Sequence, residues 1–538
     1  MTSAGDKRTS ILVTAGLWLC LAVLFIALRF DNSERIYFAI DDQVVVWLVD
    51  DIVSSGNWQP DWYRTADKRH TSAYFASEAQ RTEIPHAHHY NFTAHILLSS
   101  AAIKIIRTTG CDTPTIVLLH HIALFWDTIS WLLLISIAFR FGGMPLALSS
   151  ALIYSVFPLT VQGSHYARPD AFLTCMGTAL LWLAMNTALS RLQHWRWLLL
   201  NGLVLGAATA GKASQLMLGI FPALAASQQC LLARQHRNLH DAVRIIGDGL
   251  VLAAITALVL GFMFYIANIA PEDFWISLQS IQRYYQHPGP PELLEHYSFT
   301  GQLLTIARYF LATSGWPLVI AMLLGILSLA RCNEKFPLLL LVLPIFFFTG
   351  YFASVPAFFD RSFCALAAAM TLLAAIGSVS LLQQFRHIPA MPLLTVLITA
   401  LVCYQPVVIQ YHLQGDHLRS HHNDHRLAFQ QQLKKDFSAK TGIDFWLKNI
   451  DRSDLFSQSL PQKPENNRRI YVAEDLNDWN SRVYLQKLRD NGFVQIAVYH
   501  GDFADMPTNS LITVHEAARF YYFVRGDEVA VPDQFITR

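Results

Sequence analysis

Long apolar runs separated by short polar connections make up most of the first 410 residues. A helix needs roughly 20 mainly apolar residues to cross about 30 Å of hydrocarbon. On that rule the pattern predicts eleven membrane-spanning helices. Their predicted ranges are 10–29, 115–138, 144–161, 171–189, 197–211, 213–232, 244–268, 309–330, 336–352, 362–384 and 388–409. The chain is therefore predicted to be a polytopic α-helical membrane protein with about 11 transmembrane helices.

One further apolar segment, 93–106, contains His95 and Lys104. It is short for a crossing, so we expect it to lie in the membrane interface. With this segment left out of the count, six basic connections fall on one side of the membrane, which the positive-inside rule identifies as cytoplasmic. They contain Lys7 and Arg8, Arg140, Arg191 and Arg196, Arg234 and Arg237, Arg331 and Lys335, and Arg386.

This topology places the N-terminus in the cytoplasm and most of the connecting mass on the outer face. The outer side receives the long 30–114 loop, with its interfacial helices, and everything after residue 410. A loop of that length exceeds what a connection needs, and long ordered loops usually carry function. We expect a bacterial inner membrane with a periplasmic tail.

The tail, residues 411–538, has a different composition from the membrane part, residues 1–410. It holds 33 of the 79 charged side chains, about 26% of its residues, against about 11% of the first 410. That fraction is typical of a soluble domain. Short β-rich runs and one amphipathic helical run predict a small α/β domain. The strand candidates are 469–473, 493–499, 511–514, 520–525 and 528–531, and the helix candidate is 475–490.

Composition also excludes several classes of protein. With 53% hydrophobic and 15% charged residues, the chain is not a purely soluble enzyme. A net charge of +1 gives no electrostatic case for a nucleic-acid partner, which needs many unopposed basic residues. The seven cysteines lack metal-ligand spacing, and none follows Cys403, so we expect no disulfide in the tail.

Two adjacent acids, Asp41 and Asp42, follow the first predicted span, and Ser55-Gly56-Asn57-Trp58 comes about 15 residues later. Neighbouring carboxylates repel each other, so one of them is a candidate general base with raised proton affinity. The alternative is structural, because Asp is a favoured N-cap and Asp41 precedes an expected helix from Gln43 to Ser54. Asp41 could be both an N-cap and a general base, because the helix that it caps would orient its carboxylate.

Three further groups on the outer face carry charges that could meet an anion. They are Arg168 and Asp170 before the fourth span, Lys212 between the fifth and sixth spans, and Arg361 at the start of the tenth. Arginine binds phosphate through two parallel hydrogen bonds, and a lysine at membrane depth needs water or an anion. Helix capping, snorkelling of the long side chains and a simple interfacial ion pair remain alternatives.

A histidine-rich run, His86, His88, His89 and His95, lies in the first outer loop with His70 and Glu83. A divalent-metal site is one interpretation. No combination of these residues has the spacing of a recognisable metal site. The other interpretation is that they form hydrogen bonds at the membrane interface. We assign no cofactor.

In this order the motifs resemble the C superfamily of membrane glycosyltransferases (GT-C), which take a sugar from a polyprenyl phosphate outside the membrane. The resemblance is to the branch of lipid A aminoarabinose transferases, protein O-mannosyltransferases and Rgt-type core-sugar transferases. The matching elements cover residues 1–410: Asp41-Asp42, Ser55–Trp58, Pro85–Asn91 with Thr93–Ile106, Ala167–Asp170 and Gly206–Lys212. Many members open a late span with Arg-Tyr, where this chain has Arg361-Ser362.

The resemblance implies inverting transfer of a sugar from an undecaprenyl-type phosphate to a lipid, glycan or protein acceptor. Asp41 matches the family's catalytic acid, with Asp42 as its rival, and Asp170 would position the acceptor or a neighbouring base. Lys212, Arg168 and Arg361 would bind the donor phosphate. A weaker expectation is that His89, Arg283, Tyr284 and Tyr285 belong to loops that contact donor or acceptor.

Two other classes stay open at this stage. A secondary transporter would place charged residues at mid-span and show two related halves. Here the clearest acidic residues sit at the outer ends of helices, and no repeat is apparent. A non-catalytic sensor or assembly scaffold would use the tail as its working part.

Overall fold

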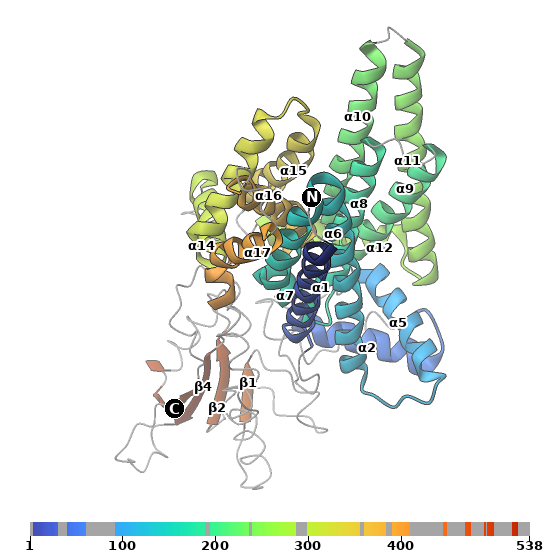
Figure 1. The fold of residues 1–538 in the computed structure, drawn as a ribbon. Coiled ribbons are helices and arrows are strands. Elements are labelled where there is room, and N and C mark those ends of the chain that lie inside the picture. Colours follow the sequence, from blue (N-terminus) through green and yellow to red (C-terminus); the bar gives the residue numbers. More distant parts are fainter. Residues whose placement is uncertain are drawn as a thin grey trace.

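The computed structural model describes residues 4–30, 40–60, 92–188, 194–235, 239–286, 298–355, 360–382, 390–408, 445–448, 469–474, 489–490, 492–499 and 519–525. Within these residues the chain forms a bundle of helices, followed by a small β-sheet near the C-terminus (Figure 1). The predicted class, mainly helical with several long apolar helices, is confirmed.

The helices follow the apolar runs. They are α1 Ala4–Ala27, α6 Thr115–Val156, α8 Asp170–Ala188, α9 His194–Gly211, α10 Ile220–Gln235, α11 Leu239–Ile266, α14 Phe299–Arg331, α15 Phe336–Ala353, α16 Ala367–Ser380 and α17 Met391–Val402. Five segments of the described residues are long and apolar enough to cross a membrane: Thr115–Val156, Ile246–Ile266, Thr313–Arg331, Phe336–Ala353 and Arg361–Ser380. The number of eleven spans stays a prediction.

Helix α6 is a hairpin of two antiparallel halves. Its backbone leaves helical geometry at Gly143, where φ is 71°, a conformation that glycine adopts without steric cost. Trp131 in the first half donates a hydrogen bond of 3.2 Å to the carbonyl oxygen of Ala151 in the second. The predicted break between residues 138 and 144 is therefore confirmed.

Glycines allow the central helices to approach each other closely. A Cβ on Gly377 of α16 would lie 1.8 Å from the carbonyl oxygen of Ala321 in α14, and one on Gly325 would lie 2.0 Å from that of Leu373. Small residues at helix contacts are the usual means of bringing backbones together in membrane proteins. As a result α16 is buried along residues 367–378.

Two shorter helices, α2 Ile40–Ser55 and α5 Thr93–Arg107, lie side by side (Figure 1). Their apolar faces share a buried cluster that includes Leu48 and Ile52 of α2 and Ile96 of α5. The predicted interfacial helix over 93–106 is thus confirmed as a helix. Helix α2 begins at Ile40, so Asp41 lies in its first turn.

Short elements complete the bundle at the turns between the long helices. They are α7 Pro158–Ser164, the 3₁₀ segment η3 Ala213–Gly219, α12 Pro271–Gln286 and the 3₁₀ segment η4 Asp360–Leu366. Helix α7 follows α6 after one extended residue, Phe157. Of these elements, α7, η3 and η4 contact α8.

The tail contains strands β1 Phe445–Lys448, β2 Arg469–Glu474, β3 Phe493–Tyr499 and β4 Arg519–Arg525. They form one sheet in the order β1-β2-β4-β3, in which only β1 and β2 pair in parallel. Three of these strands were predicted and β1 was not. The candidates at 511–514 and 528–531 lie outside the described residues, as does 475–488 of the helix candidate. The α/β domain and its boundary at residue 410 stay predictions.

Candidate functional site

The turn between α7 and α8 carries a buried ion pair. Arg168 Nε lies 2.9 Å from Asp170 Oδ2, and both side chains are at most 4% exposed. The guanidinium also lies 3.8 Å from the centroid of the Tyr166 ring. Snorkelling is therefore the wrong interpretation for Arg168. Removing either side chain would leave the other as an uncompensated buried charge, which is strongly destabilising. Each side chain therefore makes the burial of the other possible.

Asp170 is also the first residue of α8, where a negative charge is stabilised by the N-terminal end of the helix dipole. Gly163, in α7, lies beside it, since a Cβ there would contact the Asp170 Cβ at 3.4 Å. The Arg168–Asp170 pair thus sits where α7 leads into α8.

His95 of α5 reaches this turn from another part of the chain. Its Nε2 lies 2.7 Å from the carbonyl oxygen of Ala167. A carbonyl only accepts hydrogen bonds, so Nε2 carries the hydrogen and Nδ1 has a lone pair. Burial lowers the pKa of His95 to about 4, although the Ala167 hydrogen bond and the Asp170 charge oppose that effect. The imidazole is therefore neutral at pH 7.

The Nδ1 atom of His95 is buried and has no hydrogen-bond partner among the described residues. The sequence placed His95 in a histidine-rich run and in the apolar segment 93–106, and its contact with the Arg168–Asp170 turn was not foreseen. In the part of the chain that the structure describes, no three His, Cys, Asp or Glu side chains group as a metal site would require. His70, Glu83, His86, His88 and His89 lie outside that part.

Lys212 lies against the same region of α8. It follows Gly211, the last residue of α9, and a Cβ on Gly211 would lie 2.6 Å from Phe172 Cε1. Lys212 Nζ donates a long hydrogen bond of 3.4 Å to Ser362 Oγ in η4. The chain thus brings Lys212 next to the Arg361-Ser362 element from 150 positions away.

Gln215, in η3, is a second residue that the sequence did not single out. Its side chain is fully buried, and neither carboxamide atom has a partner within the described residues. Its backbone N–H donates to the Lys212 carbonyl oxygen at 2.8 Å. A glutamine inside an apolar run was the available signal.

Helix α2, which packs against α5 and α6, carries Asp41 and Asp42. Both occupy the first turn of α2, and their side chains lie outside the description. The other end of α2 is fixed by α5: Lys104 Nζ donates to the Gly56 carbonyl oxygen at 3.2 Å and lies 4.3 Å from the Trp58 ring centroid. The element Ser55–Trp58 therefore serves to hold α2 against the helix that carries His95.

The remaining predicted residues are placed only in part. Arg361 is half-buried in η4, next to Ser362. Arg283, Tyr284 and Tyr285 lie in the last turns of α12, and their side chains are not described. His89 lies outside the described residues.

Solved structures that align with the chain include ArnT from Cupriavidus metallidurans bound to undecaprenyl phosphate, at 13% identity and a TM-score of 0.47, covering 81% of this chain and 70% of that one. Another is the apo oligosaccharyltransferase of Archaeoglobus fulgidus, at 12% identity and a TM-score of 0.49, covering 84% of this chain and 61% of that one. Similarity of this degree carries no argument about ligands or reaction.

Sequence comparison is more informative. No curated protein matches the chain. Residues 115–263, however, match the family model described as dolichyl-phosphate-mannose-protein mannosyltransferase. The matching segment begins at α6 and includes Arg168, Asp170 and Lys212. This match confirms the chain's resemblance to the C superfamily of membrane glycosyltransferases.

Proposed function

We propose that this protein is an inverting membrane glycosyltransferase. It transfers a sugar from a polyprenyl-phosphate donor of the undecaprenyl type to a lipid, glycan or protein acceptor on the outer face of a bacterial inner membrane. The observation that carries the proposal is the convergence of the Arg168–Asp170 pair and the Lys212–Ser362 contact on the first turns of α8. The mannosyltransferase family match over residues 115–263 supports it.

The reaction needs a base for the acceptor and cations for the leaving group. An acceptor hydroxyl or amine attacks the anomeric carbon as its proton passes to a carboxylate. The bond between that carbon and the phosphate oxygen breaks, and the polyprenyl phosphate leaves with the electron pair. Because a phosphate is a weak base, it needs positive charge and hydrogen-bond donors more than it needs an acid.

The proposed roles follow the placement of the elements. Asp41 is the base and Asp42 its alternative, both at the start of the helix that α5 holds in place. Lys212 binds the leaving phosphate, and Arg361, next to its partner Ser362, assists. Arg168 adds positive charge beside α8, and Asp170 keeps that guanidinium in place.

Three peripheral features complete the proposal. Residues Arg283, Tyr284 and Tyr285, near the end of α12, contribute to a cover over the bound donor. The isoprenoid chain lies against apolar helix surface in the outer leaflet. His89 contacts donor or acceptor from the first outer loop.

The test is Asp41→Asn, with Asp51→Asn on the same helix as the matched control. Mass spectrometry of lipids and surface glycans is compared between cells that lack the protein and cells that express each variant at equal level. We expect wild type and Asp51→Asn to restore a glycosylated product. Asp41→Asn should lose at least about 100-fold of the transfer rate, the usual range for a missing general base. Transfer by Asp41→Asn at the wild-type rate would exclude Asp41 as the base.

A further inference from the structure

The break between α6 and α7 leaves backbone groups without helical partners. Helix α6 ends at Val156, Phe157 is extended with ψ of 122°, and Pro158 begins α7. In a continuing helix the Tyr154 carbonyl oxygen would accept from the N–H of residue 158, and proline has none. Buried carbonyl groups of this kind need donors from elsewhere.

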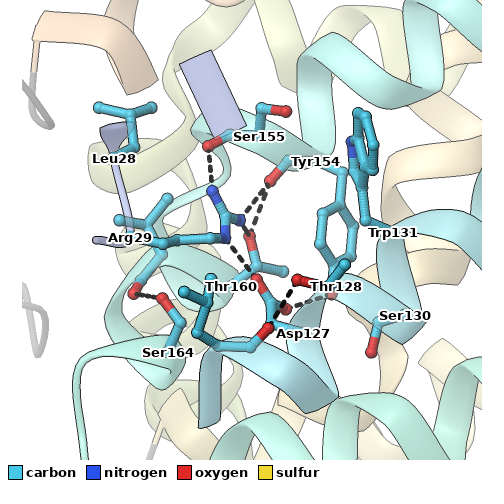
Figure 2. Close-up of polar contacts among 12 residues, drawn as sticks. Leu28, Arg29, Asp127, Thr128, Ser130, Trp131, Tyr154, Ser155, Thr160 and Ser164 are labelled. Carbon is cyan, nitrogen blue, oxygen red and sulfur yellow. Dashed lines mark hydrogen bonds and ion pairs between the residues drawn. The ribbon is translucent and has the colours of Figure 1, made fainter. Parts of the chain in front are cut away.

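Arg29, two residues beyond the end of α1, supplies donors at this break (Figure 2), and Thr160 Oγ1 supplies another to the Tyr154 carbonyl oxygen at 2.8 Å. Its Nη1 donates to the Ser155 carbonyl oxygen at 2.7 Å, and its Nη2 donates to that of Tyr154 at 3.1 Å. Nη2 also donates to Thr160 Oγ1 at 3.0 Å, in α7. One guanidinium thus bonds both helices across the break, and a positive charge at the α6 C-terminus complements the helix dipole.

Asp127, in the other half of the α6 hairpin, balances the charge. Its carboxylate forms an ion pair with Arg29 Nε, and the two side chains are at most 1% exposed. Tyr154 OH donates to the second carboxylate oxygen at 2.5 Å. The Phe25 ring covers the guanidinium, with its centroid 4.1 Å from Cζ. A buried pair of this kind gives little net stability, because desolvation offsets its attraction.

The same turn of α1 is joined to the residue that follows α7. His165 Nε2 donates to the Leu28 carbonyl oxygen at 2.9 Å. His165 is three positions before Arg168. Residues 28 and 29 therefore hold α7 from both ends, and α7 leads directly into the Arg168–Asp170 turn.

We propose that Arg29 is a positioning residue for the Arg168–Asp170 pair, acting with Asp127 through α7. This inference rests on the proposed transferase function, because it gives the pair a place in that reaction. The polar contacts of Arg29 are with α6, α7 and Asp127, not with Lys212 or Ser362. Arg29 acts by fixing the orientation of α7 relative to α6, and with it the position of Arg168 just before α8. Displacing a group by about 1 Å can cost up to about 100-fold in rate.

The test compares Arg29→Lys with Thr399→Val. A lysine at 29 keeps the charge near Asp127, but one ammonium group cannot bond both carbonyls and Thr160 together. Thr399→Val removes another buried hydrogen bond, of 2.9 Å to Ser149 Oγ between α17 and α6, away from α7. We expect Arg29→Lys to lower kcat at least about 10-fold, with KM for the lipid-linked donor within about twofold. Thr399→Val should lower the melting temperature without that loss of kcat.

Hydrogen exchange provides a readout that does not depend on catalysis. The amide hydrogens of residues 165–168 and of Asp170 should exchange faster in Arg29→Lys than in wild type, and those in Thr399→Val should not. Unchanged exchange there, or an equal loss of kcat in both variants, would overturn the positioning role. If the wild-type protein transfers no sugar, the proposed function fails, and the exchange experiment alone decides whether Arg29 orders the turn. Should Arg29→Lys not fold, the Asp127→Asn variant takes its place in both measurements.

Discussion

Acid should destabilise this protein through His95. The imidazole is completely buried against the Arg168–Asp170 turn, and burial lowers its pKa from 6.5 to about 4. Folding therefore favours the neutral ring. Its stabilising contribution is fully present above pH 6.5, where the ring is neutral in both the folded and unfolded chain. As the pH falls from 6.5 to about 4, the unfolded chain takes up a proton that the folded chain excludes.

The size of the effect follows from the two pKa values. Each pH unit between them corresponds to about 1.4 kcal/mol, so the free energy of unfolding should fall by roughly 3 kcal/mol between pH 6.5 and 4. That is a large part of the stability of an ordinary domain, which is of the order of 5–15 kcal/mol. Below about pH 4 the ring is protonated in both states and this dependence ends.

Thermal unfolding of the detergent-solubilised protein between pH 7.5 and 4 measures the effect, with His95→Gln as the variant. Glutamine places an N–H where His95 Nε2 donates to Ala167, and it does not titrate. The melting temperature of wild type should fall more steeply below pH 6.5 than that of His95→Gln. His121→Gln, at an exposed histidine of α6, should follow wild type. Parallel curves for wild type and His95→Gln would refute the buried neutral imidazole.

Two further predictions concern packing and the phosphate site. Gly377→Val should destabilise the fold by about 1–3 kcal/mol or more, because its Cβ would overlap the Ala321 carbonyl oxygen in the contact of α14 with α16. Melting of the purified protein checks this, and Gly350→Ala, where a Cβ meets no atom within 4 Å, should leave the melting temperature unchanged. Lys212→Ala should raise the KM for lipid-linked donor about 10-fold or more, as the loss of a charged hydrogen bond predicts. The control Lys335→Ala should leave this KM unchanged. If a transfer assay gives the same KM for Lys212→Ala and wild type, Lys212 is not part of the phosphate site.

The sequence predicts where most helices lie, because apolar run length is a local signal. Two predicted spans, 144–161 and 309–330, nevertheless run across breaks, at Phe157 and at Gly315. The interfacial helix α5 ends within one residue of its predicted range, and strand β3 has its predicted bounds. The strand β1 was not predicted, because four residues are too few to show the alternation of apolar and polar residues that indicates a strand. Its partner β2 lies more than twenty residues away and gives no local cue.

The candidate site is a different case, because its members meet only through tertiary contacts. Lys212 was predicted from its position in an apolar region, but nothing in the sequence links it to Ser362. His95 meets Ala167 across 72 positions. The acid at 127, inside a predicted span, did carry a signal, since a lone charge at that depth requires a partner. Its partner Arg29, 98 positions earlier, could be recognised only from the structure.

The two buried ion pairs of the structure have a common explanation. Among the described residues, the buried Arg and Asp side chains are Arg29, Asp127, Arg168 and Asp170, and no Lys or Glu is buried. The two pairs flank α7, a helix of seven residues. Apolar side chains of similar volume would stabilise the fold at least as well, because each pair must recover its own desolvation cost. Stability alone therefore does not explain them. The positioning role that we propose for Arg29 and Asp127 would explain them, because it requires a precise orientation of α7 and of the turn that follows it.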